Sequence, residues 1–216
     1  MGYVTFELTN NSDIPAIVCS GSSKTPVWIQ QHWKQGEFAS CIQNNGCGHC
    51  CAAMALNLHS VEIDPYEEYM LCRKLWGEPV YPQENFMSVA GASKMLNHLG
   101  VSAKPYASVD KYEAIKNITD ALDEGKMVIF SVGPYDANPG HPFSKGSHWV
   151  LAAGYDATGK IVVANSSLRA ITQDGIQVVE PEIIRDSLYV SERLDESRTW
   201  GIQLPRTLAG GYVIVG

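Results

Sequence analysis

The most informative stretch of the chain reads Gly46-Cys47-Gly48-His49-Cys50-Cys51-Ala52-Ala53-Met54-Ala55-Leu56-Asn57-Leu58. Apolar residues recur along it at the i, i+3, i+4, i+7 spacing of a helix, and the opposite face is nearly apolar too. A helix that is apolar all round is buried at the centre of a fold. We therefore expect a central helix from about Cys47 to His59.

Cys47 lies in the first turn of this expected helix, where backbone N–H groups without a helical partner and the macrodipole favour an anion. A thiolate is stabilised in such a position, so we expect a lowered pKa and a stronger nucleophile. A cysteine nucleophile also needs a base, usually a histidine from elsewhere in the chain. This interpretation makes Cys47 the reacting group of an enzyme.

Other chemistries fit the same cysteines. The segment Cys47-Gly48-His49-Cys50 has the Cys-x-x-Cys spacing of thiol–disulfide oxidoreductases. In those enzymes a hydrophobic strand precedes the motif, whereas here a polar loop does. Zinc could take Cys47, His49 and Cys50 as ligands, but a structural site needs a second ligand pair, and the chain has no other Cys-x-x-Cys. The remaining interpretation is a buried helix that uses cysteine as a small apolar residue.

A second informative stretch runs from Gly146-Ser147-His148 to Gly154-Tyr155-Asp156. His148 begins an apolar strand, so a rigid sheet would hold it while it stays reachable from a cleft. Asn165 ends the next expected strand, and the start of one antiparallel strand lies beside the end of its partner. We therefore expect Asn165 to orient the His148 ring, which with Cys47 makes the Cys-His-Asn arrangement of papain-like hydrolases. The other histidines are interpreted as surface or packing residues: His32, His49, His59, His98 and His141.

The chain resembles papain-like cysteine peptidases of the bacterial type that process double-glycine leader peptides, together with their relatives. These proteins carry Gly-Cys-Gly-Pro-x-x-x-Ala-Met at the head of the nucleophile helix, which stands here at residues 46–54 with Cys47 in the nucleophile position. Residues 125–129 match the family's Gly-x-x-Val-Ile strand, and residues 146–156 match its strand from Gly-x-His to Gly-Tyr-Asp. The resemblance covers about residues 27–170.

Two positions depart from the family pattern. His49 replaces the usual Pro, and Asn165-Ser166 replaces Asp-Pro, although Asn is the orienting member in papain itself. The family also places a Gln before the nucleophile, and its amide completes the oxyanion hole. Gln43 is the nearest candidate for this role, and Gln31 and Gln35 are alternatives.

The resemblance leaves a second candidate for the nucleophile. The papain motif Cys-Gly-x-Cys, in which the second cysteine is catalytic, also fits Cys47-Gly48-His49-Cys50, so Cys50 is an alternative. We prefer Cys47 because it precedes Met54 by the family's seven residues and because the helix end favours its thiolate.

The order of the expected elements predicts an α+β fold, since helices gather early and strands late. The resemblance implies a papain-like form, with the nucleophile helix packed against an antiparallel sheet that carries the catalytic His. We expect one domain over residues 1–216, with a β extension at 1–26 and the best-matched core at 27–170. The other expected helices are 64–75, 88–99, a helix capped by Ser108 or Asp110 that ends near Gly125, and 180–193; the strands are 4–8, 16–19, 27–33, 127–132, 148–155, 160–164 and 211–215.

The 216-residue chain has 16 Lys and Arg against 23 Asp and Glu, a net charge of −7. This balance argues against nucleic acid or an anionic membrane as the main partner. No apolar run approaches the roughly 18 residues of a spanning helix, so no membrane insertion is expected. No signal peptide is visible, which favours the cytoplasm, with secretion as the alternative if a leader was removed; the oligomeric state is left open.

We expect a cysteine-dependent hydrolase, a peptidase that acts on an extended peptide and needs no cofactor. The alternatives are a redox enzyme that uses Cys47 and Cys50, or an inactive papain-fold binding module. The loop 131–146 lies directly before His148 and is expected to wall the cleft. In that position its side chains Tyr135, His141 and Phe143 would contact the substrate.

Overall fold

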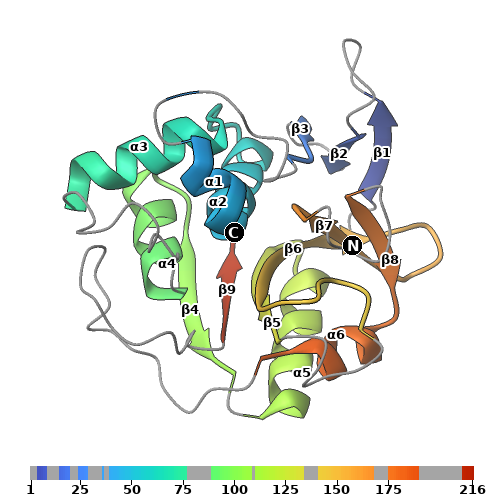
Figure 1. The fold of residues 1–216 in the computed structure, drawn as a ribbon. Coiled ribbons are helices and arrows are strands. Elements are labelled where there is room, and N and C mark those ends of the chain that lie inside the picture. The colour runs from blue at the N-terminus through green and yellow to red at the C-terminus, as the bar shows by residue number, and fades with distance from the viewer. Residues whose placement is uncertain are drawn as a thin grey trace.

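Two antiparallel sheets organise the computed structural model, which describes residues 4–8, 15–19, 24–28, 36, 39–76, 89–108, 110–133, 141–167, 175–189 and 211–216. The smaller sheet has the order β1-β2-β3 and comes from the N-terminal segment. Its strands are β1 (Val4–Leu8), β2 (Pro15–Cys19) and β3 (Lys24–Pro26). It lies beside the β6–β8 end of the larger sheet (Figure 1).

The larger sheet has six strands in the order β4-β9-β5-β6-β7-β8, and its neighbouring strands pair antiparallel. The strand bounds are β4 (Ala103–Ala107), β5 (Met127–Val132), β6 (His148–Tyr155), β7 (Ile161–Asn165), β8 (Ile176–Val179) and β9 (Gly211–Val215). The C-terminal strand β9 therefore lies between β4 and β5 in the interior of the sheet (Figure 1).

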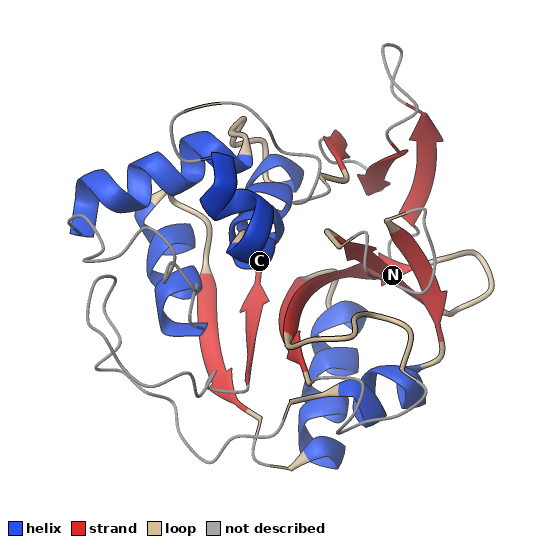
Figure 2. Ribbon diagram, viewed as in Figure 1, coloured by secondary structure: helices blue, strands red, loops and turns tan. Residues whose placement is uncertain are grey.

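Helices cover both faces of this sheet (Figure 2). One face carries α1 (Ala39–Asn45), α2 (Cys47–Leu58), α3 (Pro65–Trp76) and α4 (Val89–His98); the other carries α5 (Lys111–Asp123) and α6 (Pro181–Ser187). Side chains of β6 alternate between the two layers, since Trp149 and Leu151 pack with α2 while Val150 packs with α5. Strands buried on both faces explain the continuous apolar runs of β5 and β6.

The helix starts follow the expected capping chemistry. The Asp64 carboxylate accepts from the N–H groups of Tyr66 and Glu67, both at 2.8 Å, directly before α3. Asp110 rather than Ser108 caps α5, and its carboxylate accepts from the N–H of Tyr112 at 2.7 Å. The side-chain oxygen thus satisfies N–H groups that have no partner within the helix.

The predicted α+β class is confirmed, and so are the helices α2 to α5 and the strands β1, β2, β5, β6, β7 and β9, within about two residues at their ends. The helix expected over 180–193 ends at Ser187, since Leu188 bridges to Val132 instead. The strand expected over 27–33 is not seen at Val27 and Trp28, and its remainder lies outside the described residues, as do residues 190–193. None of the helices in the described parts of the chain is long and apolar enough to cross a bilayer.

Four elements were not expected: α1, β3, β4 and β8. The α1 sequence Ala-Ser-Cys-Ile-Gln-Asn-Asn has neither an apolar stripe nor a charged first turn. In β4, Pro105 argues against a strand, but β4 is an edge strand, where proline is tolerated. The four-residue β8 is also at an edge and is too short for a periodic signal.

Candidate active site

Cys47 is the first residue of α2, and a single glycine separates it from α1. The N–H of Gly46 donates to the carbonyl oxygen of Ile42 at 2.8 Å, so the hydrogen bonding of α1 continues up to the junction. A Cβ atom at position 46 would lie 2.4 Å from the same oxygen. Only glycine fits such a close backbone approach, and it lets α1 end directly against the first turn of α2.

The Cys47 thiol lies in the core, with only 8% of the residue exposed. Burial raises its pKa to about 11, although hydrogen bonds from the backbone N–H groups of Trp149, Gly48 and Cys47 itself lower it in part. The expected lowering of this pKa is therefore wrong. The first turn of a helix lowers a thiol pKa most where it is open to solvent, whereas here α1 adjoins the turn and the side chain is desolvated.

His148 is the first residue of β6 and Asn165 the last residue of β7, and their side chains meet. His148 Nε2 lies 2.9 Å from Asn165 Oδ1. An amide oxygen can only accept, so the ring donates from Nε2, and Nδ1 of the neutral ring carries the lone pair that can take up a proton. The neighbourhood expected from the hairpin is confirmed, with Asn165 opposite Val150 in the register.

Cys47 lies against the start of β6, next to the residue that follows His148. Cys47 Sγ accepts from the N–H of Trp149, the residue that follows His148, and the Trp149 side chain shares its core. Between the described residues Cys47 and His148 the structure has no direct hydrogen bond from thiol to ring. Catalytic hydrogen bonds are often long without substrate and tighten in the substrate complex.

Asn165 is held by a buried amide network that includes Gln177 on β8. Asn165 Nδ2 donates to Gln177 Oε1 at 2.9 Å and to the carbonyl oxygen of Phe143 at 2.8 Å. Gln177 Nε2 donates in turn to the carbonyl oxygen of Pro142 at 2.8 Å. Gln177 thus ties the orienting amide to the loop before His148. No sequence pattern singled out Gln177, because β8 was not expected.

The variant Gln177→Leu should lower the free energy of unfolding by about 2 kcal/mol, because it removes both partners that Gln177 offers to buried polar groups. Urea unfolding of the wild type and the variant measures this loss. Val178→Ala on the same strand is the matched control, since Val178 is 39% exposed and should change stability little. Equal losses for the two variants would show that the Gln177 network contributes nothing.

Burial lowers the pKa of His148 to about 4; the hydrogen bond to Asn165 opposes this shift, and the nearby His141 adds to it. The pKa of His141 is also lowered, mainly by burial. With a thiol pKa of about 11, Cys47 and His148 are therefore both neutral at pH 7 in this structure.

Mild acid should destabilise the fold through His148. Its imidazole takes up a proton near pH 6.5 when unfolded but only near pH 4 when folded, so the unfolded state binds more protons between these values. The free energy of unfolding should fall as pH decreases through this window, by about 3 kcal/mol in full. Urea unfolding at about pH 7 and about pH 4.5 measures the loss.

Two variants separate the contributions to this pH dependence. His148→Gln should make stability fall less steeply in acid, because the titrating ring is gone. His141→Gln removes the other buried histidine, whose charge acts on His148. It should account for a smaller part of the stability that is lost in acid. If the free energy of unfolding falls just as steeply in acid for His148→Gln as for the wild type, His148 is not the titrating group.

The remaining sequence candidates differ in their placement. Gln43 is half-buried on α1, one helical turn before Cys47, whereas Gln31 and Gln35 lie outside the described residues. Cys50 lies one turn deeper in α2 and is fully buried. Burial raises its pKa well above the usual value. Deeper burial makes Cys50 the weaker candidate for a group that must meet substrate.

The end of the loop 131–146 is part of the core, contrary to expectation. Phe143 is fully buried and packs edge-on against Phe130 in the core beneath α5. His141 is only 4% exposed, and its Nδ1 accepts from the N–H of Phe143 at 3.3 Å. Because both side chains are buried in contacts within the protein, neither can contact a substrate as predicted. Tyr135 lies outside the described residues.

Comparisons with known proteins bear on this site and fold. The sequence model of the Peptidase_C39 like family matches residues 26–183. Among solved structures, a protein described as a C39-like peptidase from Bacillus anthracis is 13% identical, with a TM-score of 0.45 over 88% of this chain and 93% of that one. UfSP from C. elegans is 10% identical, with a TM-score of 0.41 over 89% of this chain and 32% of that one. No curated protein matches.

The family match covers most of the chain and includes α2 with Cys47, β6 with His148 and β7, which ends in Asn165. The class of protein is therefore a cysteine peptidase-like hydrolase with an α+β papain-like fold, which acts on peptide or protein substrates. The chain belongs to the Peptidase_C39 like family. The resemblance drawn from the sequence motifs is confirmed.

Proposed function

We propose that the chain hydrolyses peptide bonds through a triad of Cys47, His148 and Asn165. The observation that supports it is the arrangement at the start of β6, where the Cys47 thiol accepts from the Trp149 N–H and the adjacent His148 ring donates to Asn165. Asn165 fixes the tautomer that leaves Nδ1 of His148 unprotonated. That nitrogen is the base that the thiol needs.

In the proposed reaction the thiol and imidazole start neutral. Sγ of Cys47 attacks the scissile carbonyl carbon while its proton passes to Nδ1 of His148. The imidazolium then gives this proton to the leaving amine as the C–N bond breaks, which leaves an acyl-enzyme thioester. Water attacks the thioester with His148 again as the base, and the thiol is regenerated. A histidine with a depressed pKa donates its proton readily, which favours departure of the amine.

The oxyanion would be stabilised by the backbone N–H of Cys47 and the side-chain amide of Gln43. Gln43 comes four residues before Cys47, on α1, and its side chain is half-buried rather than enclosed in the core. One good donor of this kind contributes roughly 3–4 kcal/mol to lowering the barrier. Gln43→Ala should therefore lower kcat by roughly 100- to 1,000-fold, which a peptide cleavage assay under saturating substrate would measure.

The redox alternative receives less support from the same geometry. A dithiol–disulfide couple needs an accessible, low-pKa cysteine, whereas burial raises the pKa of Cys47 to about 11 and that of the fully buried Cys50 well above its usual value. Reducing agents should therefore sustain the activity of this protein rather than serve as its co-substrate.

The test is cleavage of a mixture of unstructured peptides, with products identified by mass spectrometry. Cleavage that stops after alkylation of the thiols is expected, and the cleaved sequences would define which extended peptide the site accepts. Absence of any cleavage by the folded, fully reduced protein would contradict the proposal and favour a papain-fold binding module.

A further inference from the structure

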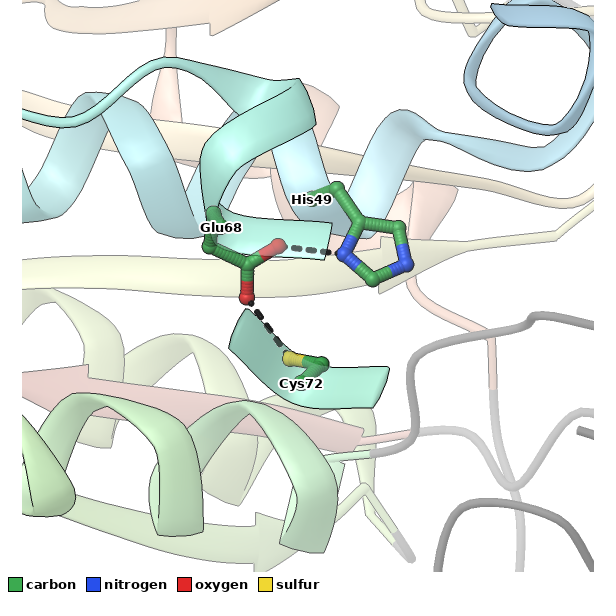
Figure 3. Close-up of side chains that lie close together, drawn as sticks. All are labelled: His49, Glu68 and Cys72. Atoms are coloured by element: carbon green, nitrogen blue, oxygen red, sulfur yellow. Dashed lines mark hydrogen bonds and ion pairs between the residues drawn. The ribbon is translucent and has the colours of Figure 1, made fainter. Parts of the chain in front are cut away.

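Behind the candidate nucleophile, three side chains with metal-binding donors meet in the interior: His49 from α2, and Glu68 and Cys72 from α3 (Figure 3). The Glu68 carboxylate lies between the other two. Oε2 forms an ion-pair contact with His49 Nδ1, and Oε1 accepts from the Cys72 thiol at 3.2 Å. One donor atom from each residue lies within 4.8 Å of the others.

Rigid helices hold these donors in place. Glu68 and Cys72 are four residues apart in α3, so they lie on one face of the helix, the spacing with which two helical side chains chelate one ion. His49 comes from the facing first turn of α2 and supplies the third donor. The site thus joins α2 and α3 close to Cys47. One of its three residues, His49, stands where the family pattern has a proline.

The electrostatics of the cluster favour a bound cation. Glu68 and Cys72 are 0% exposed and His49 is 1% exposed. A buried carboxylate is costly unless charge and hydrogen bonds compensate it, and a thiol is only a weak donor. One carboxylate, one thiolate and one neutral imidazole carry two negative charges, which a divalent ion neutralises completely. Calcium and magnesium prefer oxygen donors, whereas zinc accepts this nitrogen, oxygen and sulfur set.

We propose that His49, Glu68 and Cys72 bind a structural zinc ion that fastens α2 to α3 behind the catalytic turn. Binding requires that Cys72 lose its thiol proton and that His49 Nδ1 give up the hydrogen it shares with Glu68, and these protons pass to solvent or to Nε2. Closed burial of the donors marks the site as structural rather than catalytic. Cys50, which follows His49 in α2 and lies close enough to Glu68 for their charges to interact, is a candidate for the fourth donor.

The test begins with the full-length wild-type protein and needs no variant. After loading with zinc and removal of free metal, elemental analysis should find about one zinc per chain. Cobalt(II) in place of zinc should give the visible bands of a tetrahedral site and a near-ultraviolet thiolate charge-transfer band. A strong chelator should lower Tm. Zinc far below one per folded chain would overturn the proposal.

Variants then locate the ion. Glu68→Gln and Cys72→Ala should each weaken zinc binding by roughly 100-fold or more, since even residues beyond the ligands contribute 10- to 100-fold. Cys51→Ala is the matched control, because Cys51 is equally buried on α2 but outside the cluster, and it should retain the zinc and the charge-transfer band. Binding that survives Cys72→Ala but is lost in Cys47→Ala would place the ion in the Cys-x-x-Cys motif and overturn the assignment.

Discussion

Replacing Cys47 with alanine is expected to lower kcat/KM for peptide cleavage by at least roughly 10,000-fold. In the proposed reaction, the substitution removes the atom that forms the bond to the scissile carbonyl. Because the side chain is small and nearly buried, the fold should survive with a loss of about 1–2 kcal/mol in the free energy of unfolding. Initial rates on the best peptide from the cleavage screen measure the effect.

Cys50→Ala is the matched control for this measurement. It removes the same atoms from the same helix, one turn further in and at a fully buried position. We expect a similar loss of stability and a kcat/KM within about tenfold of the wild type. If Cys50→Ala abolishes cleavage while Cys47→Ala retains it, Cys50 is the nucleophile, and if each variant alone abolishes it, cleavage needs both cysteines and Cys47 is not the sole thiol that the reaction requires.

His148→Gln should lower kcat/KM by roughly 100- to 10,000-fold, because the reaction then lacks its general base and acid. Glutamine can still hydrogen-bond to Asn165, so circular dichroism and urea unfolding at pH 7 should report a folded protein. Asn165→Ala should cost less, since it removes the group that orients the ring but not the ring itself. Rates near those of the wild type for His148→Gln would exclude this residue from the reaction.

Asn165→Asp tests the interaction between His148 and residue 165 without relying on a loss of activity. It restores the acid of the family pattern and places a carboxylate beside His148 Nε2. A neighbouring negative charge favours the protonated ring, so the pKa of His148 should rise from about 4. The acid limb of the kcat/KM profile should shift to higher pH with it. An unshifted limb would show that its ionisation belongs to another group.

Much of the fold and the site was predictable from local sequence patterns. The all-round apolar pattern of α2 indicated a central helix, and every residue of α2 except Asn57 is buried. The apolar run that begins at His148 indicated a buried strand, and the hairpin between β6 and β7 was enough to expect the contact with Asn165. These predictions succeeded because each rests on residues that lie close together in the sequence.

The rest depends on contacts between distant segments. The pKa of Cys47 follows from its burial against β6, which the position of the residue in its helix cannot reveal. Gln177 matters only because β8 lies beside β7. His49 was interpreted as a packing residue, and its partner Glu68 comes from a helix whose sequence gives no sign of a shared site. The loop before His148 was expected to wall the cleft and to contact substrate through Phe143, but Phe143 belongs to the core.

The most direct test of the central proposal is to locate the covalent adduct of a thiol-directed peptide electrophile on the wild-type protein by mass spectrometry. Such a reagent reacts fastest with the thiol that a neighbouring base activates. We expect one adduct per chain, on Cys47, with labelling lost in Cys47→Ala and strongly slowed in His148→Gln. Labelling of another cysteine at the same rate in both variants would contradict Cys47 as the nucleophile and His148 as its base.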